Sequence, residues 1–211
     1  EATAQRTLER LIVDVLMCGV DTIYPDCFVD SWSMHLTGKN NFRYQIATTV
    51  PYKGNRVDKP KPKHLAFLRD YLVKEWGASI SEGEEADDTI AIEATKLGDN
   101  CVIVSLDKDL DQIVGWHYNF VKHLGYYIKP EEALVKLYTQ MLTGDAADNI
   151  KGLFRVGPVK AAKIIGDTTN ELELYNKVLE AYEGDAERVL ENAQLLFLRR
   201  YEGQIWTPPQ A

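Results

Sequence analysis

The chain has 211 residues, 45% of them hydrophobic and 27% charged, with a formal net charge of −8 at pH 7. This composition favours one globular α/β domain, alone or with a small appendage, and no stretch reaches the roughly 18 apolar residues of a membrane span. Cys18, Cys27 and Cys101 lack CxxC spacing, which argues against a zinc site and a disulfide framework. The first ten residues also lack the pattern of a secretion signal, so we expect a soluble cytoplasmic protein.

The first part of the chain predicts helix and strand in turn. Apolar residues at helical spacing predict a helix over residues 3–18, and residues 28–36 predict a strand that ends before Gly38. Residues 40–62 contain three prolines and little apolar periodicity, so we expect a loop or arch there. A helix then begins near Leu65.

The alternation continues through the middle of the chain. The helix over 85–97 stops at Gly98, and the apolar run 101–106 has the pattern of a buried parallel strand. We therefore expect an α/β fold with a central, mostly parallel sheet flanked by helices. The other predicted elements are a short strand at Ile80, strand segments at 120–124 and 126–128, a helix over 131–142 and two or three helices after it.

Charge is distributed unevenly along the chain. Residues 39–74 contain nine basic and two acidic side chains, a surplus of +7, whereas residues 82–111 contain ten acidic and two basic side chains, a surplus of −8. A basic segment followed by an acidic one suits an enzyme that grips phosphates with one part and cuts them at metal ions with another. A solvated surface of chance polarity explains the charges alone equally well.

The acidic residues gather in groups. Like charges close together repel, so a fold that collects carboxylates usually does so to hold divalent metal. Ordinary alternatives are acids at a helix N-terminus and a polar turn after a strand. An EF-hand loop starting at Asp107 is excluded by Gln112 and Tyr118 at its glycine and glutamate positions. The groups are Glu84, Glu85, Asp87 and Asp88; Asp107, Asp109 and Asp111; and, as a third, Asp145 and Asp148.

Residues 142–165 have a helix-hairpin-helix pattern. Gly152 and Gly157 bracket a tight turn, and Pro158 suits the first position of a helix. Glycines let backbone N–H groups approach a phosphate, while Lys160 and Lys163 add positive charge. Such a segment binds the nucleic-acid backbone and not the base sequence. A helical hairpin without function is the alternative.

Four motifs occur in the order typical of one family: YKGNR, EEADD, DKDLDQ and GDAADNIKGLFRVGPVKAA. With these motifs, which span about residues 42–165, the chain resembles the 5′ nucleases. That family comprises flap endonucleases, the 5′ nuclease domain of bacterial polymerase I and phage 5′-3′ exonucleases. The resemblance implies a PIN-like α/β core over residues 1–135, with a helical arch at about 42–76. A helix-hairpin-helix region and C-terminal helices then follow over 136–211.

The resemblance also implies an activity: 5′-3′ exonuclease or flap endonuclease hydrolysis of DNA at 5′ ends, flaps or junctions, including RNA in hybrids, by a monomer in a bacterial or phage-infected cytoplasm. It further implies two Mg²⁺ or Mn²⁺ ions, and K⁺ at the hairpin. The site residues that the motifs imply are Glu85, Asp87, Asp88, Asp107, Asp109, Asp145 and Asp148 for metal, Lys53 and Arg56 for catalysis, and Tyr52, Gly152, Gly157, Lys160 and Lys163 for DNA.

The chain departs from the family pattern in two places. An aspartate on the family's first strand has no counterpart, and we expect the chain to begin after that strand. The acid that often precedes the FR of the next strand is also absent, since Thr37, Gly38 and Lys39 stand there. Two other functions remain open: a nuclease-like fold that only binds branched DNA, and a PIN-type ribonuclease, which would not need the hairpin.

Overall fold

The computed structural model describes residues 1–19, 21, 23–25, 28–57 and 59–210. Cys27 and the side chain of Cys18, which bear on the prediction about cysteines, lie outside the described part. The helices are α1 (Ala2–Asp14), α2 (Arg43–Ile46), α3 (Leu65–Trp76), α4 (Ala86–Leu97), α5 (Pro130–Thr143), α6 (Pro158–Ile165), α7 (Glu171–Ala181) and α8 (Ala186–Leu196), with a π-helical turn at Val15–Gly19 and 3-10 turns at Gly54–Arg56, Gly98–Asn100 and Lys108–Gln112. The strands are β1 (His35–Thr37), β2 (Ser79–Ser81), β3 (Val102–Val104), β4 (Gly115–Asn119), β5 (Leu124–Ile128), β6 (Gly144–Asp145) and β7 (Ile150–Lys151).

The strands pair in three small sheets. β1 and β2 are parallel, with Leu36 opposite Ile80. β3 is parallel to β4, which turns back into antiparallel β5, and β6 and β7 form an antiparallel hairpin. The α/β fold class is thus confirmed, with parallel pairing where it was expected. The difference is that the described strands form separate small sheets and not one central sheet.

Two predicted strands were wrong in extent or position. Of residues 28–36, only the end is paired, in β1, because pairing with β2 begins where the backbone carbonyl of Met34 accepts the N–H of Ser79. Residues 120–123 are the turn between β4 and β5, held by Asn119, whose side-chain oxygen accepts the N–H groups of Val121 and Lys122. The pattern missed β4 because its sequence, GWHYN, lacks a clear apolar alternation.

The predicted helices were found close to their expected bounds as α1, α3, α4 and α5. At the start of α4, the backbone N–H of Glu85 donates to the Asp88 carboxylate at 3.1 Å, which satisfies a donor that the helix leaves free. Gly98 ends the helix with a φ of 57°, a conformation that costs glycine little. Pro158 is the first residue of α6, as the sequence predicts.

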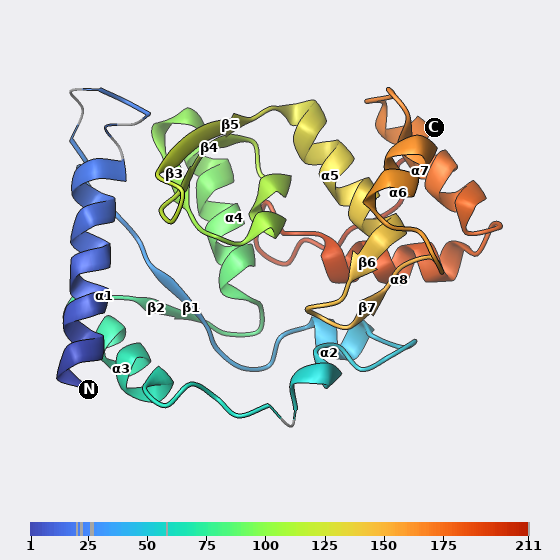
Figure 1. Cartoon of the computed structure of the whole chain (residues 1–211). Helices are drawn as coiled ribbons and strands as arrows, with labels where there is room; N and C mark the ends of the chain where they lie inside the picture. The colour runs from blue at the N-terminus through green and yellow to red at the C-terminus, as the bar shows by residue number, and fades with distance from the viewer. Residues whose placement is uncertain (20, 22, 26–27, 58, 211) are drawn as a thin grey trace.

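Two hydrophobic cores hold these elements together. The larger one lies among α5, α7 and α8 and contains Met141, Leu174 and Val189, all fully buried. The smaller one joins α4 and β3 through Ala91 and Ile103. In Figure 1, α5 to α8 lie at one end of the molecule, α1 and α3 at the other, and α4 with β3, β4 and β5 between them. The start of α4 therefore lies between the two packed ends.

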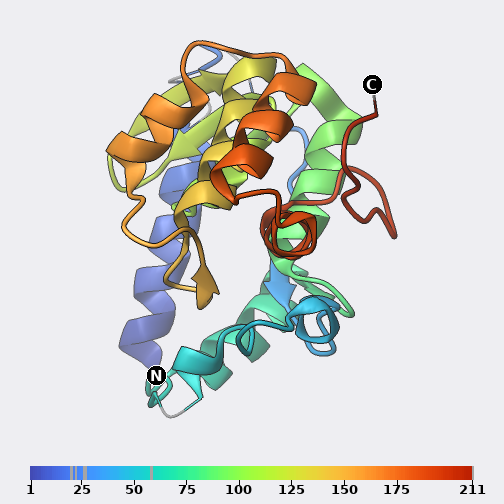
Figure 2. The ribbon, with the colours of Figure 1, turned by 90° about the vertical axis from the view of Figure 1, so that its right-hand side faces the viewer.

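Residues 43–56, at the start of the predicted arch, run beneath the β6–β7 hairpin and alongside α8 (Figures 1 and 2). The carboxylate of Glu191 in α8 accepts the backbone N–H groups of Thr48 and Thr49, each at 2.8 Å. The backbone N–H of Lys53 donates to the carbonyl of Asp148 at 2.8 Å. These contacts fix the segment that contains the predicted basic residues.

No helix in the described part of the chain combines the length and apolar content needed to cross a bilayer.

Candidate functional site

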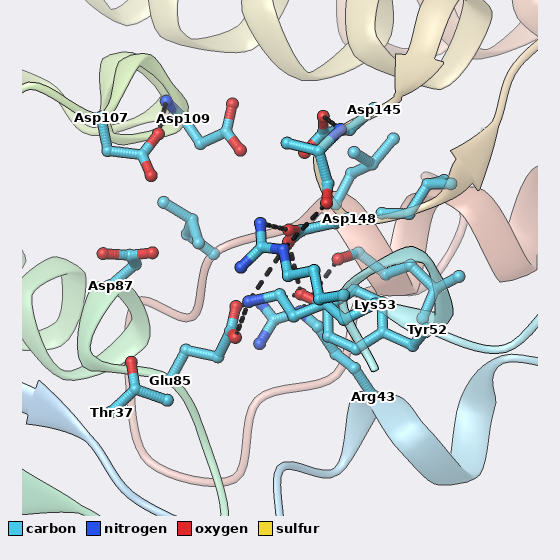
Figure 3. Close-up of a pocket in the computed structure, with 16 residues that line it drawn as sticks. Thr37, Arg43, Tyr52, Lys53, Glu85, Asp87, Asp107, Asp109, Asp145 and Asp148 are labelled. Atoms are coloured by element: carbon cyan, nitrogen blue, oxygen red, sulfur yellow. Dashed lines mark hydrogen bonds and ion pairs between the residues drawn. The ribbon is translucent and has the colours of Figure 1, made fainter. Parts of the chain in front are cut away.

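One cavity of about 340 Å³ collects most of the predicted site residues. They come from the start of α4, the turn after β3, the β6–β7 hairpin and the segment that precedes α3, and Figure 3 shows them around the same space. Residues far apart in the sequence are therefore close neighbours. The predicted residues that line the cavity are Glu85, Asp87, Asp107, Asp109, Asp145, Asp148, Lys53, Arg56 and Tyr52.

The start of α4 and the turn after β3 supply the acids on one side. Asp87 lies in the first turn of α4. Asp107 and Asp109 follow β3 at its carboxyl end, where ligands collect in parallel sheets. The carboxylate of Asp107 accepts the N–H of Asp109 at 2.9 Å, so the turn fixes the positions of these two acids relative to each other.

The β6–β7 hairpin supplies the acids on the other side. Asp145 lies in β6 and its carboxylate accepts the N–H of Ala147 at 2.7 Å. Asp148 follows in the turn, and Asn149 reverses the chain with a φ of 62°, a left-handed conformation that asparagine adopts more readily than most residues. The hairpin thus presents two acids to the acids of α4 and β3.

Two of the cavity's carboxylates are neutralised by basic side chains. Lys53 forms an ion pair with Glu85, and its Nζ lies 3.5 Å from Asp148. Arg56 contacts the other oxygen of Asp148 at 2.5 Å. We call Glu85 and Asp148, with these two basic partners, the paired side of the cavity. The two predicted catalytic residues therefore lie against two predicted metal ligands.

The other carboxylates, those of Asp87, Asp107, Asp109 and Asp145, form the unpaired side. Within the described residues they make one salt bridge, between Asp109 and Lys136 at 4.0 Å. Burial, followed by the charge of Asp107, raises the pKa of Asp87 to about 7 and that of Asp109 to about 6. Both shifts mean that the folded protein disfavours negative charge here unless a cation compensates it.

These donors fit a hydrated divalent cation. Mg²⁺ binds oxygen ligands, usually takes only one or two carboxylates and keeps several of its waters. Within the part of the chain that the structure describes, no three Asp, Glu, His or Cys side chains lie close enough to hold one ion directly. An ion on the unpaired side would therefore take part of its coordination shell from water.

Asp88 lies outside the cavity, which corrects the expectation that it is a metal ligand. Its carboxylate is fully buried and forms a two-pronged salt bridge with Arg43, at 2.5 and 2.9 Å. It also accepts the backbone N–H of Arg199 at 3.2 Å. Both oxygens are thus occupied. Arg43 continues to the backbone carbonyls of Leu195 and Phe197, so Asp88 ties α4 to the segment that follows α8.

Tyr52, which the motifs imply as a DNA-binding residue, is buried. Its ring is 4% exposed and packs edge-on against the exposed ring of Tyr44 at 5.5 Å. Its hydroxyl lies 2.7 Å from Asp148 and 3.0 Å from Glu85, and burial raises its pKa well above the usual value. Tyr52 is therefore a neutral hydrogen-bond donor to the paired side.

The predicted DNA-binding residues of the hairpin region lie away from the cavity. Lys160 and Lys163 are exposed on α6, and Gly157 at its N-terminus faces open space. Gly152 has a different reason to be glycine. A Cβ there would lie 2.3–2.4 Å from backbone atoms of Thr143 and Gly144, so this position serves the packing of the hairpin.

Sequence reasoning missed three residues that shape the site. Thr37 lines the cavity, and its hydroxyl accepts the N–H of Ala86 at 3.1 Å. Arg43 also lines the cavity. The only sequence feature that pointed to Arg43 is its position directly after Phe42, in the FR pair of the family pattern. Gln140 donates to Asp109 at 2.6 Å. A glutamine near the end of a helix has no pattern that would reveal such a contact.

Curated proteins with similar sequences include flap endonucleases and a DNA polymerase I. The chain is 26% identical over 168 residues to flap endonuclease Xni of Shewanella denitrificans and 30% identical over 160 residues to Xni of Shewanella halifaxensis. These matches cover 73% and 68% of the chain and 67% and 63% of the relatives, so the chain spans about two thirds of their length. It is also 32% identical over 172 residues to DNA polymerase I of Rhizobium leguminosarum, covering 71% of the chain and 16% of that protein. No family model matches the chain.

Solved structures share the fold. A crystal structure of the bacteriophage T5 flap endonuclease with DNA and metal ions has a TM-score of 0.63 and 19% sequence identity, and covers 87% of this chain and 78% of the phage protein. The T5 protein co-crystallised with metal ions has a TM-score of 0.60 and 20% identity, and covers 79% and 76%. The similar sequences and the shared fold together support this chain as a member of the 5′ nuclease family.

Proposed function

We propose that this protein is a metal-dependent phosphodiesterase that cuts DNA at 5′ ends, flaps and junctions, as a 5′-3′ exonuclease and flap endonuclease. One observation carries the proposal: a single cavity places four carboxylates of the unpaired side opposite Lys53 and Arg56. Carboxylates without a close basic partner suit divalent cations, and two basic side chains beside them suit a phosphate. The similarity to flap endonucleases agrees with this chemistry.

The cofactor of the proposed reaction is Mg²⁺ or Mn²⁺, with two ions in the cavity. When bound, such ions activate water and stabilise the leaving oxygen of a phosphodiester. We assign their binding to Asp87, Asp107, Asp109 and Asp145, partly through water. This donor set is supported by the raised pKa values of Asp87 and Asp109, which mark negative charge that needs a cation.

Lys53 and Arg56 have the role of binding the scissile phosphate. Their N–H groups can donate to its non-bridging oxygens and offset charge that builds there during cleavage. Both side chains contact Glu85 or Asp148 in this structure, so the phosphate must replace those contacts. A cation on the unpaired side would attract the phosphate and make this exchange easier. We therefore expect metal binding to promote phosphate binding.

The region after the core is proposed to hold the DNA backbone. Gly157 and the two lysines of α6 form an open, basic helix start, which suits a phosphate. We assign residues 1–135 to the nuclease core with its arch and residues 136–211 to this DNA-binding region, with K⁺ at its hairpin. We further propose a monomer that acts in a bacterial or phage-infected cytoplasm, with RNA in hybrids as a further substrate.

The test is cleavage of a 5′-labelled flap duplex, with and without Mg²⁺. We expect product only with metal, and about 10³-fold less of it from the Asp107→Asn variant. Asp111→Asn is the matched control, because Asp111 belongs to the same turn but its carboxylate accepts the Tyr126 hydroxyl outside the cavity. Tight binding without product, unchanged by Asp107→Asn, would favour a module that only binds branched DNA. Cleavage of single-stranded RNA alone would favour a PIN-type ribonuclease.

A further inference from the structure

A chain of buried side-chain amides connects the segment after α8 to Asp109. Gln112 and Gln140, which are 1% and 7% exposed, form its two links. The Nε2 of Gln112 donates to the Oε1 of Gln140 at 2.9 Å, and the Nε2 of Gln140 donates to the Oδ1 of Asp109 at 2.6 Å. We call this arrangement the amide relay. It ends on a carboxylate of the unpaired side.

Backbone groups fix the orientation of the first amide. The Oε1 of Gln112 accepts the N–H of Leu198 at 3.3 Å, and its Nε2 donates a second hydrogen bond to the carbonyl of Leu196 at 2.9 Å. Rotating this amide by 180° would set its oxygen against the Leu196 carbonyl and its NH₂ against the Leu198 N–H. Two hydrogen bonds would become two repulsive contacts inside the core, which is costly for buried polar groups.

The orientation of Gln112 determines that of Gln140. Since Gln112 presents a donor, Gln140 must turn its oxygen toward Gln112, and its NH₂ group then faces Asp109. Gln140 can therefore only donate to this carboxylate. The Oδ1 of Asp109 thus accepts the hydrogen bond from Gln140, and the Nζ of Lys136 lies 4.0 Å from the same oxygen. Among the described residues, none donates a hydrogen bond to Oδ2, so this atom is left for another ligand.

We propose that Gln140, oriented by Gln112, is a positioning residue that holds Asp109 for a divalent cation in the cavity. The proposal rests on the metal-dependent function proposed above and adds a residue that the family motifs do not contain. Residues that hydrogen-bond to a metal ligand fix the geometry of that ligand. Removing such a residue typically lowers metal affinity or activity 10- to 100-fold. A purely structural role for the two amides predicts lower stability and unchanged metal binding.

The test is Mn²⁺ binding to the protein without DNA, followed by the electron paramagnetic resonance signal of free Mn²⁺. Gln140→Leu removes the donor and keeps similar bulk, and we expect its Mn²⁺ affinity to be about 10-fold lower. Gln194→Leu is the matched control, because Gln194 is also a part-buried helical glutamine but donates to the carbonyl of Trp206. Its Mn²⁺ affinity should equal that of the unaltered protein.

A second variant tests the orientation of the relay. Gln112→Glu keeps the size of the side chain but offers no donor to Gln140, so the Gln140 amide should turn and place its oxygen against Asp109. We expect a loss of Mn²⁺ affinity at least as large as that of Gln140→Leu. Thermal unfolding of each variant establishes that it is folded at the temperature of the binding experiment, and if one is not, the other carries the test.

The outcomes separate this proposal from the proposed function. If the unaltered protein binds no Mn²⁺, the metal-dependent function fails first. If it binds Mn²⁺ and folded Gln140→Leu or Gln112→Glu binds it equally well, the proposed function stands and the positioning role of Gln140 is overturned. Weaker binding in both variants, with an unchanged Gln194→Leu, supports the relay.

Discussion

The two sides of the cavity contain the same chemical groups in opposite electrostatic states. On the paired side, Lys53 and Arg56 neutralise the carboxylates of Glu85 and Asp148. On the unpaired side, burial and neighbouring carboxylates raise the pKa values of Asp87 and Asp109. Crowding of acids therefore does not by itself mark a metal site. The acids that lack a close basic partner mark the place where a cation is needed.

Asp87 and Asp88 give the same contrast within two consecutive residues. The carboxylate of Asp87 faces the cavity, whereas that of Asp88 is enclosed with Arg43 in the interior. Successive helical residues point about 100° apart, so one acid can serve chemistry while the next serves the fold. Substitutions around these two kinds of acid should therefore have different effects on stability and on metal binding.

The largest expected effect concerns the enclosed pair. Arg43→Met leaves Asp88 as a buried charge without a partner and removes the bonds from Arg43 to the carbonyls of Leu195 and Phe197. We expect a loss of about 3–5 kcal/mol in the free energy of unfolding, measured by urea denaturation. Lys74→Met is the control, since Lys74 forms an exposed pair with Asp70 that should contribute little. Equal stability of the two variants would refute the structural role of Asp88.

The next effect distinguishes metal binding from cleavage. Lys53→Met should lower cleavage of a flap substrate by about 10²-fold, because a donor to the phosphate is lost. The same change should raise Mn²⁺ affinity, because it removes a positive charge from the cavity that repels a cation. Lys136→Met, which removes a more distant charge beside Asp109, shows how much of the rise is general electrostatics. The account would be contradicted if Lys53→Met weakened Mn²⁺ binding.

The smallest effect concerns pH. The pKa of Asp87 is about 7 in the folded protein and has an ordinary value of 3.8, so between these values the native state keeps a proton that the unfolded state has lost. Stability without metal should therefore be fullest at low pH and fall as pH rises toward 7. We expect a melting temperature a few degrees lower at pH 8 than at pH 5.5, and less difference in Asp87→Asn.

Added Mg²⁺ should offset this loss at pH 8, because it compensates the charge on Asp87. A metal-free melting temperature that rises between pH 5.5 and pH 8, and that Asp87→Asn does not alter, would contradict the assigned state of this group.

Local sequence patterns predicted much of the fold. Apolar periodicity located α3, α4 and α5, and Gly98 marked the end of α4, because such signals act within a few residues of themselves. They failed at β4, because its sequence GWHYN has no apolar alternation and its place is set by backbone pairing with β3 on one side and β5 on the other. The pairing of β1 with β2 joins segments that are far apart in the chain, and local patterns do not show it.

For the site, the sequence motifs identified the acids but did not show which of them are paired with a basic side chain. DKDLDQ and EEADD indicated Asp87, Asp107 and Asp109, all of which line the cavity. The enclosure of Asp88 could not be predicted, because its partner Arg43 lies 45 residues away. The burial of Tyr52 and the contact of Gln140 with Asp109 similarly arise from packing between distant segments.

The central claim is that the unpaired side binds divalent metal, and the most direct test is anomalous diffraction from a crystal of the protein soaked in Mn²⁺. We expect an anomalous peak beside Asp87, Asp107, Asp109 or Asp145, with water completing the coordination shell of the ion. The peak should be lost in the double variant Asp107→Asn/Asp109→Asn. A cavity without a peak in crystals that bind Mn²⁺ elsewhere, or a peak confined to Glu85 and Asp148, would contradict it.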